Sequence, residues 1–218
     1  MRLLDLTRLL LTAERRSLLW TRLVHGGEVH QTTPYTCEDR YPELFDLAAR
    51  VAPDARRILS FGCSTGEELV ALRRRFPEAE IVGSEINSRS RRIARRRVEE
   101  DPRTLVVKHD AVSGMFDVIF ALAVLQREPH KIAEMEVVDL SPHYPHQRFD
   151  AAACDLARML KPGGLLCVAN AHYRIEDSSV AGQFEPTAES PVMEGPIFGP
   201  DGRRLDGATG RTVFRKVA

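Results

Sequence analysis

Short apolar runs separated by amphipathic segments occupy the middle of the chain. The apolar runs are Ile58–Phe61, Ile81–Val82, Leu105–Val107, Phe116–Leu125 and Leu165–Ala169. The segments between them with helical spacing of apolar residues are Glu67–Arg75, Ser88–Glu100 and Phe149–Leu160. Nearly continuous apolar strands that alternate with helices are typical of a parallel sheet covered on both faces. Because crossovers between parallel strands are right-handed, the pattern predicts a doubly wound α/β fold.

Both ends of the chain depart from this alternation. Leucines recur at helical spacing over residues 3–20, and a second helix is predicted from Pro42 until Pro53 stops it. The polar stretch between these helices contains the chain breakers Gly26 and Gly27. We therefore divide the chain into an N-terminal helical extension or lid, residues 1–40, and one α/β domain, residues 41–218. Residues 174–211 are rich in turn formers and predict a hairpin or lid-like excursion before an edge strand over residues 212–217.

Composition narrows the classes of function. Lys plus Arg and Asp plus Glu number 31 each, so the chain lacks the surplus of basic charge on which general nucleic-acid binding depends. No apolar run is long enough to span a bilayer, and charged residues interrupt the leucine-rich N-terminus, which excludes a secretory signal. The four cysteines are widely spaced and predict neither a disulfide framework nor a metal site. We expect a cytoplasmic protein without a membrane span.

The segment from residue 58 to residue 68 reads ILSFGCSTGEE and carries the clearest chemical pattern. It combines a buried strand, a tight turn of small residues and a helix start. Gly62 and Gly66 let the backbone approach a ligand closely at the carboxyl end of the strand. Glu85 follows Gly66 by nineteen residues and ends the next strand, so its carboxylate can accept hydrogen bonds from both ribose hydroxyls of a nucleoside.

The residues around this turn distinguish between nucleoside cofactors. A dinucleotide fingerprint would have glycine at positions 64 and 67, where Ser64 and Glu67 stand. Glu67 and Glu68 would repel a pyrophosphate at the helix start, but they tolerate the positive sulfonium and ammonium of S-adenosylmethionine. No Gly-Lys-Ser/Thr follows the turn, which excludes a P-loop. An NAD-dependent oxidoreductase remains an alternative.

Over residues 36–170 the chain resembles the class I S-adenosylmethionine-dependent methyltransferases. The resemblance rests on four motifs in order, namely ILSFGCSTGEE, IVGSE, HDAVSGMFDVIFALAVLQ and LARMLKPGGLLCVAN. The first motif, together with Thr36 and Arg40 upstream, is similar to the chemotaxis-receptor methyltransferase branch. The resemblance implies a Rossmann-like, mostly parallel seven-stranded sheet. It also implies S-adenosylmethionine as methyl donor and S-adenosylhomocysteine as product.

The resemblance also implies where the cofactor binds. Thr36 and Arg40 would contact the methionine carboxylate, with Asp39 near the ammonium. The glycine turn would pack against the methionine portion, Glu85 would hold the ribose, and Asp110 with Ala111 would lie at the adenine edge. The full set of implied cofactor contacts is Thr36, Arg40, Gly62, Cys63, Ser64, Thr65, Gly66, Glu85, Ile86, Asp110, Ala111, Ala121 and Leu122. We expect no metal ion.

Two departures from the family pattern bear on the acceptor. Ser60 stands at the end of the first strand, where the family usually has an acidic residue. The residues at 121–125 lack the polar pair of the receptor-methylating enzymes. An Asn/Asp-Pro-Pro-aromatic motif, which would suit methylation of adenine or glutamine amino groups, is also absent. These departures favour a small-molecule acceptor over a protein or an RNA. A non-catalytic cofactor-binding protein of the same fold is the alternative from a different class.

The sequence offers no sharp catalytic constellation. Methyl transfer from a sulfonium needs chiefly proximity and alignment, so a dedicated base is not required. His172 and Tyr173 after the fifth strand, and Tyr35 in the lid segment, are candidates to orient or deprotonate the acceptor. The arginines at positions 89–97 are interpreted as a solvated helix face, and the histidines at 130, 143 and 146 as part of a polar loop. The N-terminal leucine stripe leaves a homodimer open, although packing on the domain itself is the simpler interpretation.

Overall fold

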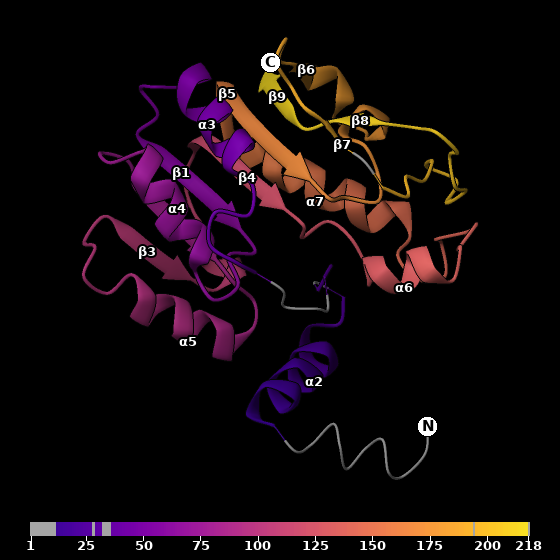
Figure 1. Ribbon diagram of the computed structural model, residues 1–218, viewed down its shortest axis with the longest axis horizontal. Helices are drawn as coiled ribbons and strands as arrows, with labels where there is room; N and C mark the ends of the chain where they lie inside the picture. Colours follow the sequence, from indigo (N-terminus) through magenta and orange to yellow (C-terminus); the bar gives the residue numbers. More distant parts are fainter. Residues whose placement is uncertain (1–11, 28, 32–35, 194, 218) are drawn as a thin grey trace.

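The computed structural model describes residues 12–27, 29–31, 36–193 and 195–217. Its centre is a seven-stranded sheet with the strand order β3-β2-β1-β4-β5-β9-β6 (Figure 1). Strands β1 to β5 are parallel, β9 pairs antiparallel with β5, and β6 pairs antiparallel with β9. This architecture confirms the predicted doubly wound, mostly parallel sheet. The strands are β1 Arg57–Phe61, β2 Glu80–Ser84, β3 Thr104–Val107, β4 Phe116–Leu122, β5 Leu160–Ala169, β6 Phe184–Pro186 and β9 Val213–Lys216.

Two apolar cores lie on opposite faces of the sheet. Successive residues of a strand point to opposite faces, and Ile58 and Leu59 of β1 accordingly belong to different cores. One core contains buried side chains of α3, α4 and α5, and the other contains those of α6 and α7. The helices are α3 Pro42–Val51, α4 Glu67–Arg75, α5 Ser88–Arg97, α6 Pro129–Glu134 and α7 His146–Met159.

Several predicted boundaries shift for identifiable reasons. The predicted helix over residues 67–75 coincides with α4, whereas α5 ends at Arg97, three residues before the predicted end. Strand β4 stops at Leu122 because Ala123 takes a left-handed backbone conformation with φ 55°. The helix α6 was not expected, and α7 begins at His146. Consequently His130 and His146 lie on helices, and their assignment to a loop is wrong.

The prediction of a C-terminal edge strand is also wrong. Strand β9 lies inside the sheet, and the edge is β6, which the excursion after β5 delivers. The rings of Phe184 and Phe214 lie 6.4 Å apart across this last pair of strands. The Ser190 Oγ accepts the backbone N–H groups of Thr212 and Val213 at 3.0 and 2.9 Å, which fixes the start of β9. The excursion also contains a small two-stranded sheet, β7 Val192–Met193 with β8 Gly210–Arg211.

The predicted N-terminal helix is confirmed as α2, Ala13–His25, which lies beyond the carboxyl ends of the central strands (Figure 1). Residues 1–11 of its predicted range lie outside the described residues. The buried Asn87 anchors the helix, because its Nδ2 donates to Thr21 Oγ1 at 2.9 Å and its Oδ1 accepts from Ser17 Oγ at 3.1 Å. The same Oδ1 accepts the first N–H groups of α5 as an N-cap. Within the described residues, no helix has both the length and the apolar character needed to cross a bilayer.

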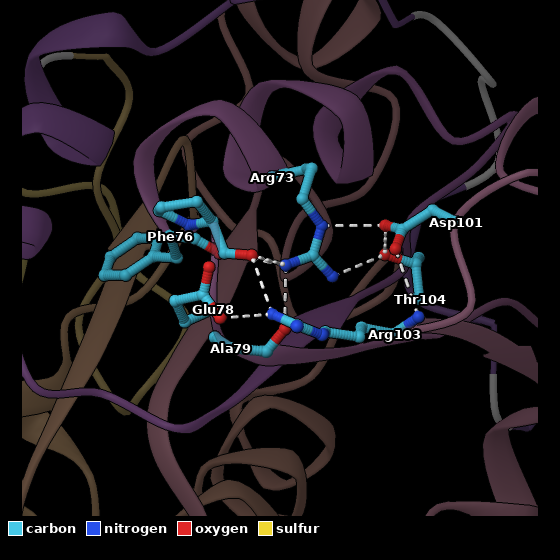
Figure 2. A network of polar contacts seen from close by, with 8 residues as sticks. Arg73, Phe76, Glu78, Ala79, Asp101, Arg103 and Thr104 are labelled. Atoms are coloured by element: carbon cyan, nitrogen blue, oxygen red, sulfur yellow. Dashed lines mark hydrogen bonds and ion pairs between the residues drawn. The ribbon is translucent and has the colours of Figure 1, made fainter.

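A polar network lies at the opposite, amino ends of the strands and is centred on Arg73 of α4 (Figure 2). The Arg73 Nη1 donates to the carbonyls of Phe76, Pro77 and Ala79 at 2.8–3.0 Å. Its Nε donates to Asp101 at 2.7 Å, and its Nη2 donates to Thr104 Oγ1 at 3.1 Å. One guanidinium therefore ties α4 to the loops that precede β2 and β3.

Candidate active site

The carboxyl ends of β1, β2 and β4 open into a cavity of about 1180 Å³, a volume that includes its solvent-filled mouth. Strand β1 is where the strand order reverses direction, and this switch point is the usual ligand site of an open α/β sheet. Helix α2 and residues 29–31 form the roof, and the segment before α3 forms a wall. The floor consists of Phe61, Gly62, Ser84, Glu85 and Leu122.

The turn after β1 is held close to its neighbours. The N–H groups of Gly62 and Cys63 both donate to the Ser84 carbonyl at 2.9 Å, which ties the turn to the end of β2. Gly62 has φ +78°, and a Cβ there would lie 2.7 Å from Val124 Cγ2. Gly66 has φ +91°, and a Cβ there would lie 3.0 Å from the Ala94 Cα, so this glycine serves the packing of α4 on α5.

Glu85 lies on the cavity floor at the end of β2. Its Oε2 accepts the Ser64 N–H at 3.0 Å, and its Oε1 accepts the Asn87 N–H at 2.6 Å. Burial raises the pKa of the Glu85 carboxyl, while these two N–H groups act against the rise. Each carboxylate oxygen has a further lone pair, so Glu85 can accept two hydroxyls in addition to these two backbone donors.

Glu68 brings a second carboxylate to the cavity from the first turn of α4. Its Oε1 accepts the Ser60 Oγ hydrogen at 2.7 Å. Burial raises the pKa of Glu68 to about 7, and the hydrogen bond from Ser60 and the positive charge of Arg40 oppose the rise. Glu68 therefore places an acid beside Ser60, the position where the family pattern would have one in the strand. The sequence indicates Glu68 only as a charge at the helix start, because spacing alone does not reveal this contact.

The polar groups of the cavity fit S-adenosylmethionine. The hydroxyls of Ser64 and Ser84 are buried at the cavity wall and have no hydrogen-bond partner among the described residues. Buried polar groups are normally satisfied, since leaving one unpaired costs about 1–3 kcal/mol. These hydroxyls and the carboxylates of Glu68 and Glu85 suit a ligand that combines hydroxyls with positive charge. S-adenosylmethionine carries ribose hydroxyls, an ammonium and a sulfonium.

The structure brings most of the predicted cofactor contacts together. Those that line the cavity are Thr36, Arg40, Gly62, Cys63, Ser64, Glu85, Ile86 and Leu122. Further lining residues were not expected from the sequence and include Tyr41, Glu68, Ser84, Asn87 and His109. Burial raises the pKa of the Cys63 thiol well above its usual value, which agrees with a packing role.

The remaining predicted cofactor contacts lie outside the cavity lining. The Thr65 hydroxyl donates to Glu67 at 2.7 Å, Asp110 pairs with Lys108 at 2.6 Å, and Asp39 pairs with Arg75 at 2.7 Å. His109 lines the cavity in place of Asp110, with its ring 4.8 Å from that of Phe61. The others outside the lining are Gly66, the exposed Ala111 and the buried Ala121.

The candidate acceptor-orienting residues also fall outside the lining. His172 is buried with its Nε2 3.1 Å from the Arg127 carbonyl, and the Tyr173 hydroxyl donates to the Tyr144 carbonyl at 2.6 Å. Tyr35 lies outside the described residues. His30 does line the cavity, with its Nδ1 2.6 Å from the Tyr144 hydroxyl. Burial, together with the charge of Arg148, lowers the pKa of His30 to about 4, so this imidazole is neutral at neutral pH.

The arginines of α5 brace the loops around the cavity. Arg91 Nη1 donates to the Glu85 carbonyl at 2.8 Å, and Arg97 Nε donates to the Thr65 carbonyl at 2.8 Å. Arg95 Nε donates to the carbonyl at position 106 at 2.9 Å. The helix face predicted to be merely solvated therefore supports the turn after β1 and the end of β2.

Comparisons with known proteins identify the relatives of this chain. Residues 30–186 match the family described as a methyltransferase domain. The release factor glutamine methyltransferase of Bacteroides thetaiotaomicron is 31% identical over 141 residues, which cover 57% of this chain and 50% of that protein. The trans-aconitate 2-methyltransferase of Deinococcus radiodurans is 27% identical over 144 residues, which cover 60% of this chain and 47% of that protein. The chain thus spans about half the length of the curated relatives it matches.

A solved structure shares the fold. The N-methyltransferase NodS from Bradyrhizobium japonicum WM9 superposes with a TM-score of 0.50 at 15% sequence identity. The match covers 83% of this chain and 99% of NodS. The family match over residues 30–186 is to a methyltransferase domain and not to an NAD-dependent oxidoreductase.

Proposed function

Because the chain belongs to the methyltransferase domain family, we propose that it transfers the methyl group of S-adenosylmethionine to a small molecule. The family assignment confirms the class and the cofactor predicted from the sequence. The roofed cavity is the observation that supports a small acceptor, since α2 and residues 29–31 cover the carboxyl ends of β1, β2 and β4 and make the site concave. The similarity to the chemotaxis-receptor branch is proposed only for the way the cofactor is held, because the polar pair after β4 is missing.

Different residues of the cavity would bind different parts of the cofactor. The Glu85 carboxylate accepts the two ribose hydroxyls, and the Ser84 hydroxyl pairs with the same end of the ligand. Glu68 faces the ammonium, while Arg40, which lines the same wall, holds the methionine carboxylate. When bound, S-adenosylmethionine supplies a methyl group on a sulfonium, which is already an activated leaving group.

The described parts of the proposed lid, residues 1–40, that cover the cavity are α2 and residues 29–31, and they would exclude water from the reacting atoms. With Leu18 of α2 and Val29 as apolar parts of its roof, the cavity desolvates the positive charge that disappears during transfer. Neutral His30 adds a hydrogen-bonding group without adding charge. The rate then depends on how the chain aligns the acceptor with the methyl group, and no residue needs to act as a strong base.

Cofactor affinity is expected to depend on pH through Glu68. In the ligand-free protein the Glu68 carboxyl has a pKa of about 7, so it is mostly protonated below pH 7. Below that pH it must lose its proton before it can face the ammonium as a carboxylate. Wild-type affinity for S-adenosylhomocysteine should fall about tenfold from pH 8 to pH 6 and should be accompanied by proton release. Calorimetry in two buffers of different ionisation enthalpy measures both quantities. The Glu68→Gln variant should show a much flatter profile, and equal proton release by the two proteins would contradict this role.

The raised pKa of Glu68 also makes the stability of the ligand-free protein depend on pH. Without ligand, the folded pKa of Glu68 is raised above its unfolded value of 4.5. Its contribution to the free energy of unfolding is therefore fully present below pH 4.5 and is lost as the pH rises through about 7. In Glu68→Gln this part of the pH dependence should disappear.

The proposed activity is tested by labelling. The purified chain is incubated with S-[methyl-³H]adenosylmethionine and, in separate reactions, with a metabolite extract, a protein extract and total RNA. We expect label in a small-molecule product, and we expect that the Glu85→Ala variant does not form it. Label confined to protein or RNA would overturn the small-molecule assignment. Tight binding of S-adenosylhomocysteine without transfer to any fraction would favour the non-catalytic alternative.

A further inference from the structure

A second cavity, of about 840 Å³ including the open solvent at its mouth, adjoins the first one at the carboxyl end of β5. Asn170, which follows β5, lines it together with the start of α3 and strand β7. Arg40 and Tyr41 line both cavities, so the two spaces meet at the segment before α3. Along the edge of the sheet, Glu85 at the end of β2 lies at one side and Asn170 at the other. The second cavity therefore lies away from the ribose end of the cofactor cavity.

Asn170, which lines the second cavity, offers a side-chain hydrogen-bond acceptor beside Tyr41. The Asn170 Nδ2 donates to the Tyr41 hydroxyl oxygen at 2.8 Å, which fixes the amide. Within the described part of the chain, no hydrogen bond uses the Asn170 Oδ1. Asn170 has a φ of 50°, a left-handed conformation that asparagine tolerates better than most residues. This backbone geometry and the hydrogen bond to Tyr41 hold the Asn170 amide in the second cavity, beside a residue that lines both cavities.

Apart from Arg40, Tyr41, Glu43 and Asn170, the second cavity is lined mainly by apolar side chains. Its walls include Leu44 of α3, Pro191, and Val192 and Met193 of β7. The Thr212 hydroxyl, which also lines the cavity, already donates to the Pro191 carbonyl at 2.8 Å. This lining suits a small molecule with an apolar body and one polar group that points toward Asn170.

We propose that this second cavity is the acceptor subsite and that it takes a small molecule with an apolar body and a hydroxyl or amine. The acceptor's O–H or N–H donates to Asn170 Oδ1, which directs a lone pair toward the cofactor cavity. A bond then forms between the acceptor oxygen or nitrogen and the methyl carbon, and the carbon–sulfur bond breaks. The sulfur leaves with the bonding electron pair as a neutral thioether, and the acceptor's proton passes to water. Asn170 and Tyr41 are positioning residues in this scheme, which rests on the proposed function.

The test fills the cavity without touching the cofactor site. Val192 is 49% exposed and lines the cavity, whereas Val217 is 48% exposed and does not, so Val217→Trp is a matched control for Val192→Trp. A third variant, Asn170→Gly, removes the amide and keeps a residue that accepts the left-handed backbone. Each protein is assayed for S-adenosylhomocysteine affinity by calorimetry and for transfer of tritium to the metabolite extract.

We expect Val192→Trp and Asn170→Gly to lower transfer at least about tenfold while S-adenosylhomocysteine affinity stays at the wild-type value. Val217→Trp should behave as wild type. Once the labelled product identifies the acceptor, Asn170→Gly should change its KM or kcat without changing the KM for S-adenosylmethionine. A purely structural role would instead alter cofactor affinity and the melting temperature together.

The outcomes separate this proposal from the proposed function. Wild-type transfer in Val192→Trp and Asn170→Gly would overturn the subsite and leave the roofed cavity as the acceptor site. A wild-type protein that binds S-adenosylhomocysteine but transfers no label to the metabolite extract would overturn both proposals. If Val192→Trp does not fold, Asn170→Gly decides, because it adds no volume to the cavity.

Discussion

Replacement of Glu85 by alanine is expected to weaken S-adenosylhomocysteine binding at least about a hundredfold. A hydrogen bond to a charged group contributes about 1.5–3 kcal/mol, and Glu85 is proposed to make two of them to the ribose. The substitution also removes the acceptor of the Ser64 and Asn87 N–H groups, at 3.0 and 2.6 Å, so the turn after β1 loses one of its ties to the end of β2. Both effects act in the same direction, and calorimetric titration measures their sum.

Two further variants identify the cause of this loss. Glu80→Ala removes an exposed carboxylate at the other end of the same strand, where it pairs with Arg57 at 3.1 Å, and should leave the affinity unchanged. Glu85→Gln keeps the side-chain shape and one oxygen, so its affinity should lie between those of the wild type and Glu85→Ala. An unaltered dissociation constant in a folded Glu85→Ala protein would mean that the ribose is held elsewhere.

Replacement of Arg73 by alanine is expected to lower the free energy of unfolding by about 2–3 kcal/mol, since a partly buried hydrogen bond to a charged group contributes about 1.5–3 kcal/mol. The Arg73 side chain is only 22% exposed and pairs with Asp101 at 2.7 Å. The substitution leaves Asp101 without its cation and removes the donor to the carbonyls of Phe76, Pro77 and Ala79 (Figure 2). Urea denaturation monitored by circular dichroism gives the change in free energy.

Arg103 provides the control from the same network. Its side chain is 52% exposed and pairs with Glu78 at 2.5 Å, so Arg103→Ala should cost less than about 1 kcal/mol. Equal losses in the two variants would refute the special position of Arg73. Because the network lies at the amino ends of the strands, folded Arg73→Ala should retain wild-type affinity for S-adenosylhomocysteine.

The sequence predicted the parallel half of the fold well because that half follows from local patterns. Strands buried on both faces must be apolar throughout, and the helices between them must be amphipathic, so residues 67–75 were placed correctly as α4. The antiparallel end of the sheet was not predictable in this way. Strand β6 has three residues and ends in a proline, which suits an edge but gives no periodicity. Its place is decided by the contact of Phe184 with Phe214, thirty residues further along the chain.

The candidate site was predicted to the extent that it lies at strand ends. Parallel strands meet at one edge, so Gly62 and Glu85 had to come together. Asp110 did not follow, because the 3-10 turn His109–Ala111 after β3 turns the histidine toward the cavity and leaves the acid beside Lys108. The contact of Glu68 with Ser60 depends on how α4 packs against β1. This packing geometry cannot be predicted from residue spacing.

Asn87 is a single side chain shared by two structural elements, since it caps α5 and also holds α2 over the cavity. Its backbone N–H donates to the Glu85 carboxylate, so we expect ligand binding at that carboxylate and the docking of α2 to be thermodynamically linked. Linkage is reciprocal, and any factor by which the cofactor tightens the helix must equal the factor by which a docked helix tightens the cofactor. Selection acting only on the N-terminal helix could thus tune cofactor occupancy in the cell without altering any residue of the nucleoside site.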